Sequence, residues 1–183
     1  MNNKSIWAEI RFMLILSFIC GLLLGGTNIA IGNRGELSEK TISTIFNFSK
    51  INIEPQRIYE QFEAEFEAVS KGRIKIWKNK KNLSVIACEA TGSGMWGEIT
   101  IVFVIDKTNQ QLLGLKVTEQ KETAGLGSKI SEEAFLNQFI NKSIQNEIKV
   151  DAITGATTSS RSVEKLLNRA LNKIKDLKPQ IKI

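Results

Sequence analysis

The apolar residues of this chain follow two different patterns. Residues 12–31 form an apolar run that only a few small or polar residues interrupt, whereas later apolar residues recur at strand or helix spacing. A run of about 20 residues has the length of a membrane-spanning helix. Lys4 and Arg11 precede it, which favours an N-terminus on the inner side. We therefore predict a transmembrane anchor over residues 1–34 in the cell's inner (cytoplasmic) membrane, with the following domain on its periplasmic or extracellular side.

A cleaved signal peptide is the alternative interpretation of this segment, with residues 12–24 as its apolar core. The stretch Asn28-Ile29-Ala30 is a poor cleavage site for a signal peptidase, and Ile19 before Cys20 argues against a lipoprotein signal. We favour a retained, single-pass anchor.

The region after the anchor predicts a linker with amphipathic helices over residues 35–72. Its apolar residues recur at helical spacing in two stretches, the second starting after Pro55. These positions are Ile42, Ile45, Phe46 and Phe48, then Ile58, Phe62, Phe66 and Val69.

Strands dominate the next part of the chain. Alternating or β-branched runs joined by short polar turns predict antiparallel strands over residues 73–77, 83–88, 99–105 and 111–118. A helix over 131–140, a β-compatible stretch over 148–150 and a long helix with apolar residues from Val163 to Leu177 follow. The order indicates an α+β fold: one N-terminal transmembrane helix, then a single domain over residues 73–183 with a largely antiparallel sheet flanked by helices.

The amino-acid composition limits the ligands and cofactors that this chain can use. The net charge is +6, but the only dense basic run, residues 71–81, contains a single aromatic residue, Trp77. A solvated face near lipid headgroups is therefore favoured over nucleic-acid binding. The chain has no histidine and two cysteines, Cys20 and Cys88, too few for an iron–sulfur cluster or a closed zinc site. We predict no metal site and no catalytic side chain, so any redox work needs an organic cofactor.

The start of the long C-terminal helix is the strongest candidate site. The turn from Asp151 to Ser160 contains five hydroxyl side chains, and a helix N-terminus offers free N–H groups to a phosphate. The simpler interpretation is that Thr158, Ser159 or Ser160 caps the helix. Capping needs one hydroxyl only, so the excess indicates a ligand.

The segment Asp151-Ala152-Ile153-Thr154-Gly155-Ala156-Thr157 resembles the flavinylation motif D-x-x-[ST]-G-A-T of the FMN-binding domain family. The Rnf ferredoxin:NAD oxidoreductase and the sodium-pumping NADH:quinone reductase each have one subunit in that family, designated G in the first complex and C in the second. The resemblance implies FMN held covalently by a phosphoester to Thr157. The neighbouring cofactor-binding residues that it implies are Asp151, Thr154, Gly155, Ala156 and Thr158. Ala152 replaces a residue that is often Gly or Ser in the family.

Two glycine-rich loops carry the rest of the resemblance. Residues 92–97 spell G-x-G-x-x-G, but a strand follows where a dinucleotide fingerprint requires a helix. Residues 94–97 instead resemble the family's loop beside the isoalloxazine ring, which implies that Met95 and Trp96 contact the flavin. The alternative is a β-turn with a buried tryptophan.

The second loop covers residues 122–127. Residues 125–129, which overlap it, have a glycine pattern close to that of a P-loop but with Ser-Lys in place of Lys-Ser/Thr. The second loop resembles the family's E-T-P-G-L-G loop, with Ala124 for proline and Gln120 where the family often has histidine. The flavin contacts implied here are Glu122, Thr123, Gly125 and Leu126.

These resemblances imply a membrane-anchored electron-transfer subunit of an Rnf-type ion-translocating ferredoxin:NAD oxidoreductase complex, which is not catalytic alone. The expected partners are the other membrane subunits, the lipid bilayer and a flavin transferase that attaches the FMN. Three alternatives stay open: the equivalent subunit of a sodium-pumping NADH:quinone reductase, a non-catalytic flavin-binding scaffold or sensor, and a basic membrane-surface module.

Overall fold

The computed structural model describes residues 7, 10–21 and 37–177, and the chain divides into two units, residues 1–38 and 39–183. In the first unit, residues 10–21 form a helix whose side chains are all exposed. Within these described ranges, no helix is both long and apolar enough to cross a membrane. Residues 1–6, 8–9 and 22–34 of the predicted anchor lie outside the described residues.

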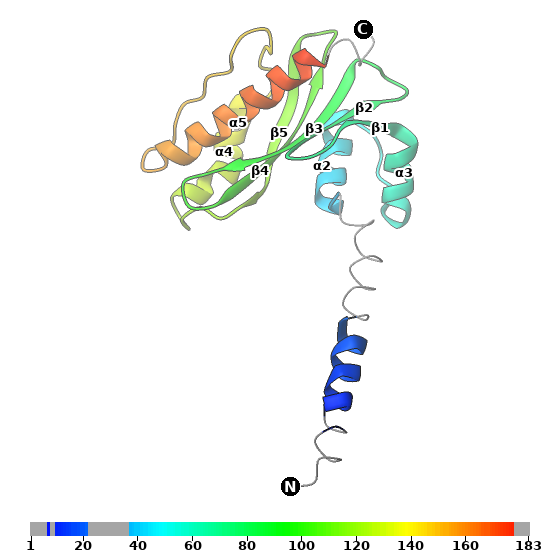
Figure 1. Cartoon of the computed structure of the whole chain (residues 1–183). Helices are drawn as coiled ribbons and strands as arrows, with labels where there is room; N and C mark the ends of the chain where they lie inside the picture. The colour runs from blue at the N-terminus through cyan, green and yellow to red at the C-terminus, as the bar shows by residue number, and fades with distance from the viewer. Residues whose placement is uncertain (1–6, 8–9, 22–36, 178–183) are drawn as a thin grey trace. The chain divides into compact units, whose positions relative to one another are not determined.

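A five-stranded sheet forms the centre of the second unit (Figure 1). Neighbouring strands in the sheet are also neighbours in sequence, and every pair is antiparallel. The strands are β1 Phe66–Ser70, β2 Ile74–Asn79, β3 Val85–Ser93, β4 Glu98–Asp106 and β5 Gln111–Gln120. The predicted antiparallel α+β fold is confirmed.

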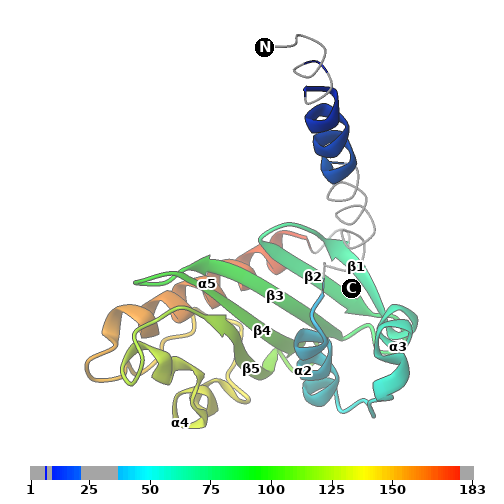
Figure 2. The ribbon, with the colours of Figure 1, turned by 90° about the horizontal axis from the view of Figure 1, so that it is seen from below.

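Helices cover both faces of this sheet (Figure 2). One face packs against α2 (Glu39–Ser49), which also contacts α3 (Ile58–Glu65) after the short 3-10 helix η1 (Pro55–Arg57). The other face packs against α5 (Thr157–Asp176) and three short helices: η2 Gly127–Ser131, α4 Glu133–Leu136 and η3 Asn137–Phe139. Because both faces are covered, β4 is buried at every position from Ile99 to Ile105.

The helix predicted to continue to Val69 ends earlier, and β1 begins at Phe66. The helical spacing in the sequence arises because Phe66 stacks on Phe62 with ring centroids 5.0 Å apart, across the junction between helix and strand. Phe46 and Trp77 join this aromatic cluster. Residues 35–72 therefore contribute α2, α3 and β1 to the unit that contains the sheet. The boundaries at residues 34 and 72 stay a prediction.

The β-compatible stretch before the candidate site is not a strand, because side chains rather than a neighbouring strand satisfy its backbone. The backbone N–H of Ile148 donates to Asn168 Oδ1 at 2.9 Å, and Asn168 Nδ2 donates back to the Ile148 carbonyl at 2.8 Å. The N–H of Val150 donates to Glu164 Oε2 at 2.8 Å. Both side chains belong to α5, so this helix holds the segment that leads into its own start.

Candidate functional site

The predicted acceptor, Thr157, is the first residue of α5, and its side chain is exposed. The chain reaches it through a tight turn in which Gly155 has a φ of +83°, a conformation that favours glycine. The N–H of Ala156 donates to the Ile153 carbonyl at 2.9 Å across this turn. The helix therefore starts at a small, open bend with Thr157 and Thr158 both at the surface.

The hydroxyls of this turn do not serve as helix caps. Ala156 occupies the N-cap position, and α5 has no side-chain cap hydrogen bond. Ser160, buried in the first turn, accepts a hydrogen bond from the Ile153 N–H at 3.1 Å and donates to the Ala156 carbonyl at 2.9 Å. Ser159 faces another part of the chain. Ser160 thus holds the turn, while Thr154, Thr157 and Thr158 stay exposed.

Ser159 leads to the centre of the site. Its hydroxyl donates to Glu122 Oε2 at 2.6 Å. The other oxygen of Glu122 accepts hydrogen bonds from the backbone N–H groups of Met95 at 2.9 Å and Trp96 at 3.3 Å. We call this set, the Glu122 carboxylate with the Ser159 hydroxyl and the two N–H groups, the Glu122 clamp. It joins the three segments that the sequence singled out: the loop at 94–97, the loop at 122–127 and the start of α5.

Close packing around the clamp explains why glycines recur in all three segments. A Cβ on Gly94 would lie 2.1 Å from Glu122 Oε1. On Gly127 it would lie 2.8 Å from Glu122 Cβ and 3.1 Å from Ser159 Oγ. A Cβ on Gly155 would meet Leu126 Cδ2 at 3.2 Å, which places the second loop beside the motif turn. Side chains at these positions would push the three segments apart.

Large apolar side chains are exposed beside these contacts. The exposed fraction is 57% for Met95, 70% for Trp96 and 48% for Leu126. Residues 94–97 form the turn between β3 and β4, as the alternative interpretation expected, but Trp96 is not buried. These exposed Met, Trp and Leu side chains lie on loops that the hydrogen bonds of the clamp hold together, and they offer a surface suited to a flat aromatic ligand.

The remaining predicted residues lie on the same segments. Thr123 is exposed, and its carbonyl accepts the N–H of Ser128 at 3.0 Å. The N–H of Gly125 donates to Ser128 Oγ at 3.0 Å. Asp151 is exposed at the start of the motif, and its N–H donates to Gln138 Oε1 at 2.8 Å.

Two contributors were missed by the sequence interpretation. Ser159 was considered only as a cap, although its hydroxyl belongs to the clamp. Gln120 was noted only because the family often has histidine at this position. Its side-chain oxygen accepts the backbone N–H of Glu122 at 2.6 Å and so helps to fix the backbone that carries the clamp. One signal in the sequence could have indicated Ser159. It is a short polar residue directly after the motif, at a helix position that faces the core.

Comparison with known protein families finds a match that includes this region. Residues 94–172 match the FMN-binding domain family. The match starts at the first loop and includes the second loop and the whole motif turn. The resemblance expected from the sequence is confirmed, and all residues of the clamp lie within the matched range.

Relatives of known type match the chain to different extents. The chain is 23% identical over 191 residues to the subunit designated G in the proton-translocating ferredoxin:NAD(+) oxidoreductase complex of Clostridium ljungdahlii, with 94% of both chains covered. It is 26% identical over 124 residues to the subunit designated C in the Na(+)-translocating NADH-quinone reductase of Vibrio vulnificus, with 57% of this chain and 49% of that one covered. Against the subunit designated G in the ion-translocating oxidoreductase complex of Haemophilus influenzae it is 35% identical over 108 residues, covering 50% and 52%. The chain thus spans nearly all of the first relative and about half the length of the other two.

Two solved structures share the fold of this chain. NqrC of Shewanella oneidensis superposes with a TM-score of 0.56 and 15% identity, covering 76% of this chain and all of that one. The subunit designated C in the Na(+)-translocating NADH-quinone reductase of Parabacteroides distasonis gives a TM-score of 0.54 at 17% identity, with 76% and 93% covered.

Proposed function

We propose that this chain is an FMN-carrying electron-transfer subunit of an ion-translocating ferredoxin:NAD oxidoreductase complex. The family match supports FMN as the cofactor. The observation that carries the proposal for this chain is the Glu122 clamp, which joins the two loops to the start of α5, where Thr157 is exposed. The first relative supports this type of complex over a quinone reductase, because similarity to it extends over nearly the whole chain.

The covalent link is proposed at the hydroxyl of Thr157. A flavin transferase would use FAD as donor: the Thr157 oxygen bonds to the phosphorus of the FMN half, the pyrophosphate bond breaks and AMP leaves. A threonine hydroxyl is a weak nucleophile without a base, so the transferase has to accept its proton. Thr157 is open to such an enzyme, and Asp151 and Thr154 are exposed on the same turn.

This chain's own residues would position and shield the cofactor, while the bound flavin supplies the electron-carrying chemistry. Met95, Trp96 and Leu126 offer apolar contact to a planar ring, and Thr123 and Gly125 lie on the loop that contains Leu126. The clamp fixes these loops relative to α5. Both Glu122 oxygens are already used within the protein, so we assign Glu122 a positioning role rather than a direct contact with the flavin.

We also propose that residues 1–34 anchor the chain in the cytoplasmic membrane, with the FMN domain on the outer side. The exposed apolar helix at residues 10–21 supports this proposal, because an apolar surface of that kind is stable in lipid. The other membrane subunits of the complex would then be its partners.

Substitution of Thr157 tests the covalent link. We expect Thr157→Ala, made in the full chain and coexpressed with a flavin transferase, to lose all flavin fluorescence in a denaturing gel, whereas wild type shows a fluorescent band. The fold should survive, because only an exposed hydroxyl is removed. Thr158→Ala is the matched control, since Thr158 is the next exposed threonine, and it should keep the flavin.

Mass spectrometry of the intact chain should show the mass of one FMN less one water on wild type and on Thr158→Ala only. A wild-type chain without flavin in the presence of the transferase would contradict the proposal and favour the non-catalytic scaffold. Flavin retained by Thr157→Ala would move the link to another residue.

A further inference from the structure

Helix α5 carries the net charge of the described part of the globular unit. Residues 39–156 contain fifteen basic and fifteen acidic residues, whereas residues 157–177 contain five basic and two acidic ones. The FMN-binding function proposed above uses only the first turn of this helix. The rest of its exposed surface therefore calls for a separate explanation.

The basic residues of α5 are arranged in a row. Arg161, Lys165, Arg169 and Lys173 follow one another at intervals of four, so they lie along one side of the helix. The two ends of the row are engaged: Arg161 Nη1 contacts Glu164 Oε2 at 2.6 Å, and Lys173 Nζ donates to the Ile74 carbonyl at 3.2 Å. Lys165 and Arg169, in the middle, are exposed, and their side chains make no hydrogen bond or ion pair with any residue that the structure describes.

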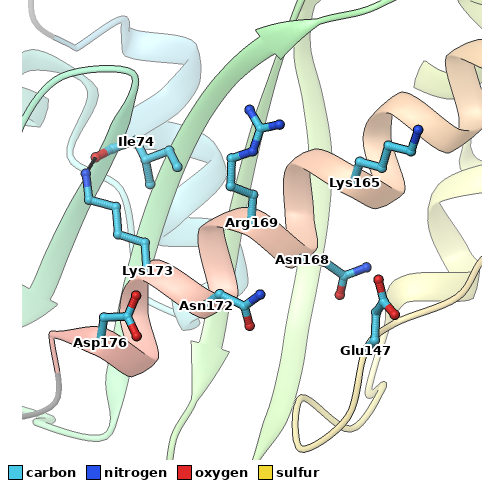
Figure 3. Close-up of a pocket in the computed structure, with 8 residues that line it drawn as sticks. All are labelled: Ile74, Glu147, Lys165, Asn168, Arg169, Asn172, Lys173 and Asp176. Atoms are coloured by element: carbon cyan, nitrogen blue, oxygen red, sulfur yellow. Dashed lines mark hydrogen bonds between the residues drawn. The ribbon is translucent and has the colours of Figure 1, made fainter.

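A groove of about 530 Å³ runs beside these two residues (Figure 3). Figure 3 shows the side chains of Lys165 and Arg169 extending from α5, with Asn168 and Asn172 between the row and Glu147. The lining residues are Ile74, Glu147, Lys165, Asn168, Arg169, Asn172, Lys173 and Asp176. The surface is thus concave. Its lining includes the two unpaired cations, the amides of Asn168 and Asn172, and the carboxylates of Glu147 and Asp176.

We propose that this row and groove form the docking surface for an acidic face of a partner protein. Charge complementarity argues for an acidic partner. Its identity as a neighbouring redox subunit rests on the proposed function: the row begins one turn after Thr157, so a protein docked along α5 lies next to the flavin. The helix of 20 residues is about 30 Å long, enough for one side of a small interface.

A bilayer surface fits this row less well. A helix that lies in the headgroup layer inserts an exposed apolar face, and among the described residues no large exposed hydrophobic belongs to α5. Its apolar residues pack against the sheet instead. Glu147 and Asp176 would also face the phosphates of anionic lipids at close range, whereas a protein partner can offer each of them a donor.

Photo-crosslinking in native membranes tests this proposal. The full chain would carry p-benzoyl-L-phenylalanine in place of Asn172, an exposed residue of the groove, in cells that contain the whole complex. We expect an adduct with another protein of the complex, and mass spectrometry of the crosslinked peptide should locate it in an acidic segment. The same probe in place of Lys116, an exposed residue of β5, should not give this adduct.

Charge reversal then tests the role of the row. Lys165→Glu/Arg169→Glu should lower the adduct yield on the order of tenfold at low salt. Lys50→Glu/Lys116→Glu changes the net charge equally at exposed positions away from α5 and should leave the yield unchanged. A lipid adduct only, no adduct, or an equal loss with both double variants would overturn the proposal. The readout does not require flavin, so a chain that docks but carries no FMN would refute the proposed function alone.

Discussion

Two buried glutamates hold different parts of this domain, and they are held in different ways. Glu89 on β3 and Glu122 after β5 each have 8% of their surface exposed. Glu89 pairs with the ammonium group of Lys75 at 2.8 Å and accepts the hydroxyl of Thr41 at 2.8 Å. Among the described residues, the side chain of Glu122 accepts hydrogen bonds from neutral donors only: two backbone N–H groups and the Ser159 hydroxyl.

This difference indicates different roles: the contacts of Glu89 stabilise the fold, whereas those of Glu122 hold the loops of the candidate site together. Glu89 joins two adjacent strands and α2, all within the part of the domain that is packed on both faces. Glu122 joins segments that lie 27 and 37 residues away in sequence, and each ends in exposed side chains. Loss of Glu89 should therefore affect the stability of the whole domain, whereas loss of Glu122 should mainly disturb the relative positions of the loops.

Alanine substitution of each glutamate gives the largest expected effects. Glu89→Ala removes both the ion pair with Lys75 and the hydrogen bond from Thr41, and it should lower the free energy of unfolding by about 3 kcal/mol, while the folded fraction still takes up flavin. Glu122→Ala should cost about 2 kcal/mol, because its donors lie near water, but should reduce the flavin bound per folded chain severalfold.

Urea unfolding measures the free energy of unfolding of each variant. In-gel flavin fluorescence, divided by the amount of folded protein, measures the flavin bound per folded chain. Glu122→Gln is a useful intermediate, since the amide keeps one acceptor oxygen. If Glu122→Ala takes up flavin as well as wild type does, the clamp has no role in the site.

The sequence predicted the features that local patterns encode. Strand alternation located β2 to β5, because each is joined to the next by a short turn. Spacing along α5 located its buried face from Val163 onward. The motif segments were found through family resemblance, and the family match confirms that resemblance.

The features that it missed depend on partners far away in the chain. β1 is a strand because it pairs with β2. Its first residue, Phe66, lies four positions after Phe62 and packs on it, so the two residues have the spacing of a helix. Residues 148–150 look like a strand, but Asn168 and Glu164 supply their hydrogen bonds. The contact between Ser159 and Glu122 spans 37 residues, so no local pattern could show that the motifs meet through these two side chains.

Substitution of the two buried serines sharpens the comparison within the site. Ser159→Ala removes one hydrogen bond to a carboxylate, and Ser160→Ala removes bonds to the backbone of its own turn. Each should cost about 1 kcal/mol of stability. Only Ser159→Ala should also change the flavin absorbance spectrum, because it loosens the loop that carries Met95 and Trp96. Equal spectra for the two variants would remove Ser159 from the site and leave it a purely structural residue.

The smallest expected effect concerns Cys88, which precedes Glu89 on β3 and points to the opposite face. Burial raises the pKa of the Cys88 thiol far above its ordinary value of 9.0, and the nearby Glu89 charge adds to this. The folded thiol stays protonated above pH 9 while the unfolded thiol ionises, so the thiol contributes nothing below that pH and lowers stability as pH rises above it. At pH 9.5 the wild-type chain should lose about 0.8 kcal/mol more stability than Cys88→Ala does, relative to pH 7.

Because Cys88 is buried, the rate at which its thiol is labelled can compare the effects of Glu89→Ala and Glu122→Ala on opening of the sheet. In a Cys20→Ser background, which removes the exposed cysteine, a thiol reagent should reach Cys88 only when the sheet opens. Labelling should accelerate on the order of a hundredfold in Glu89→Ala and about thirtyfold in Glu122→Ala, in line with the stability losses expected for the two variants. If Glu122→Ala exposes Cys88 as fast as Glu89→Ala does, the clamp supports the core as much as the site, and the distinction between the two glutamates fails.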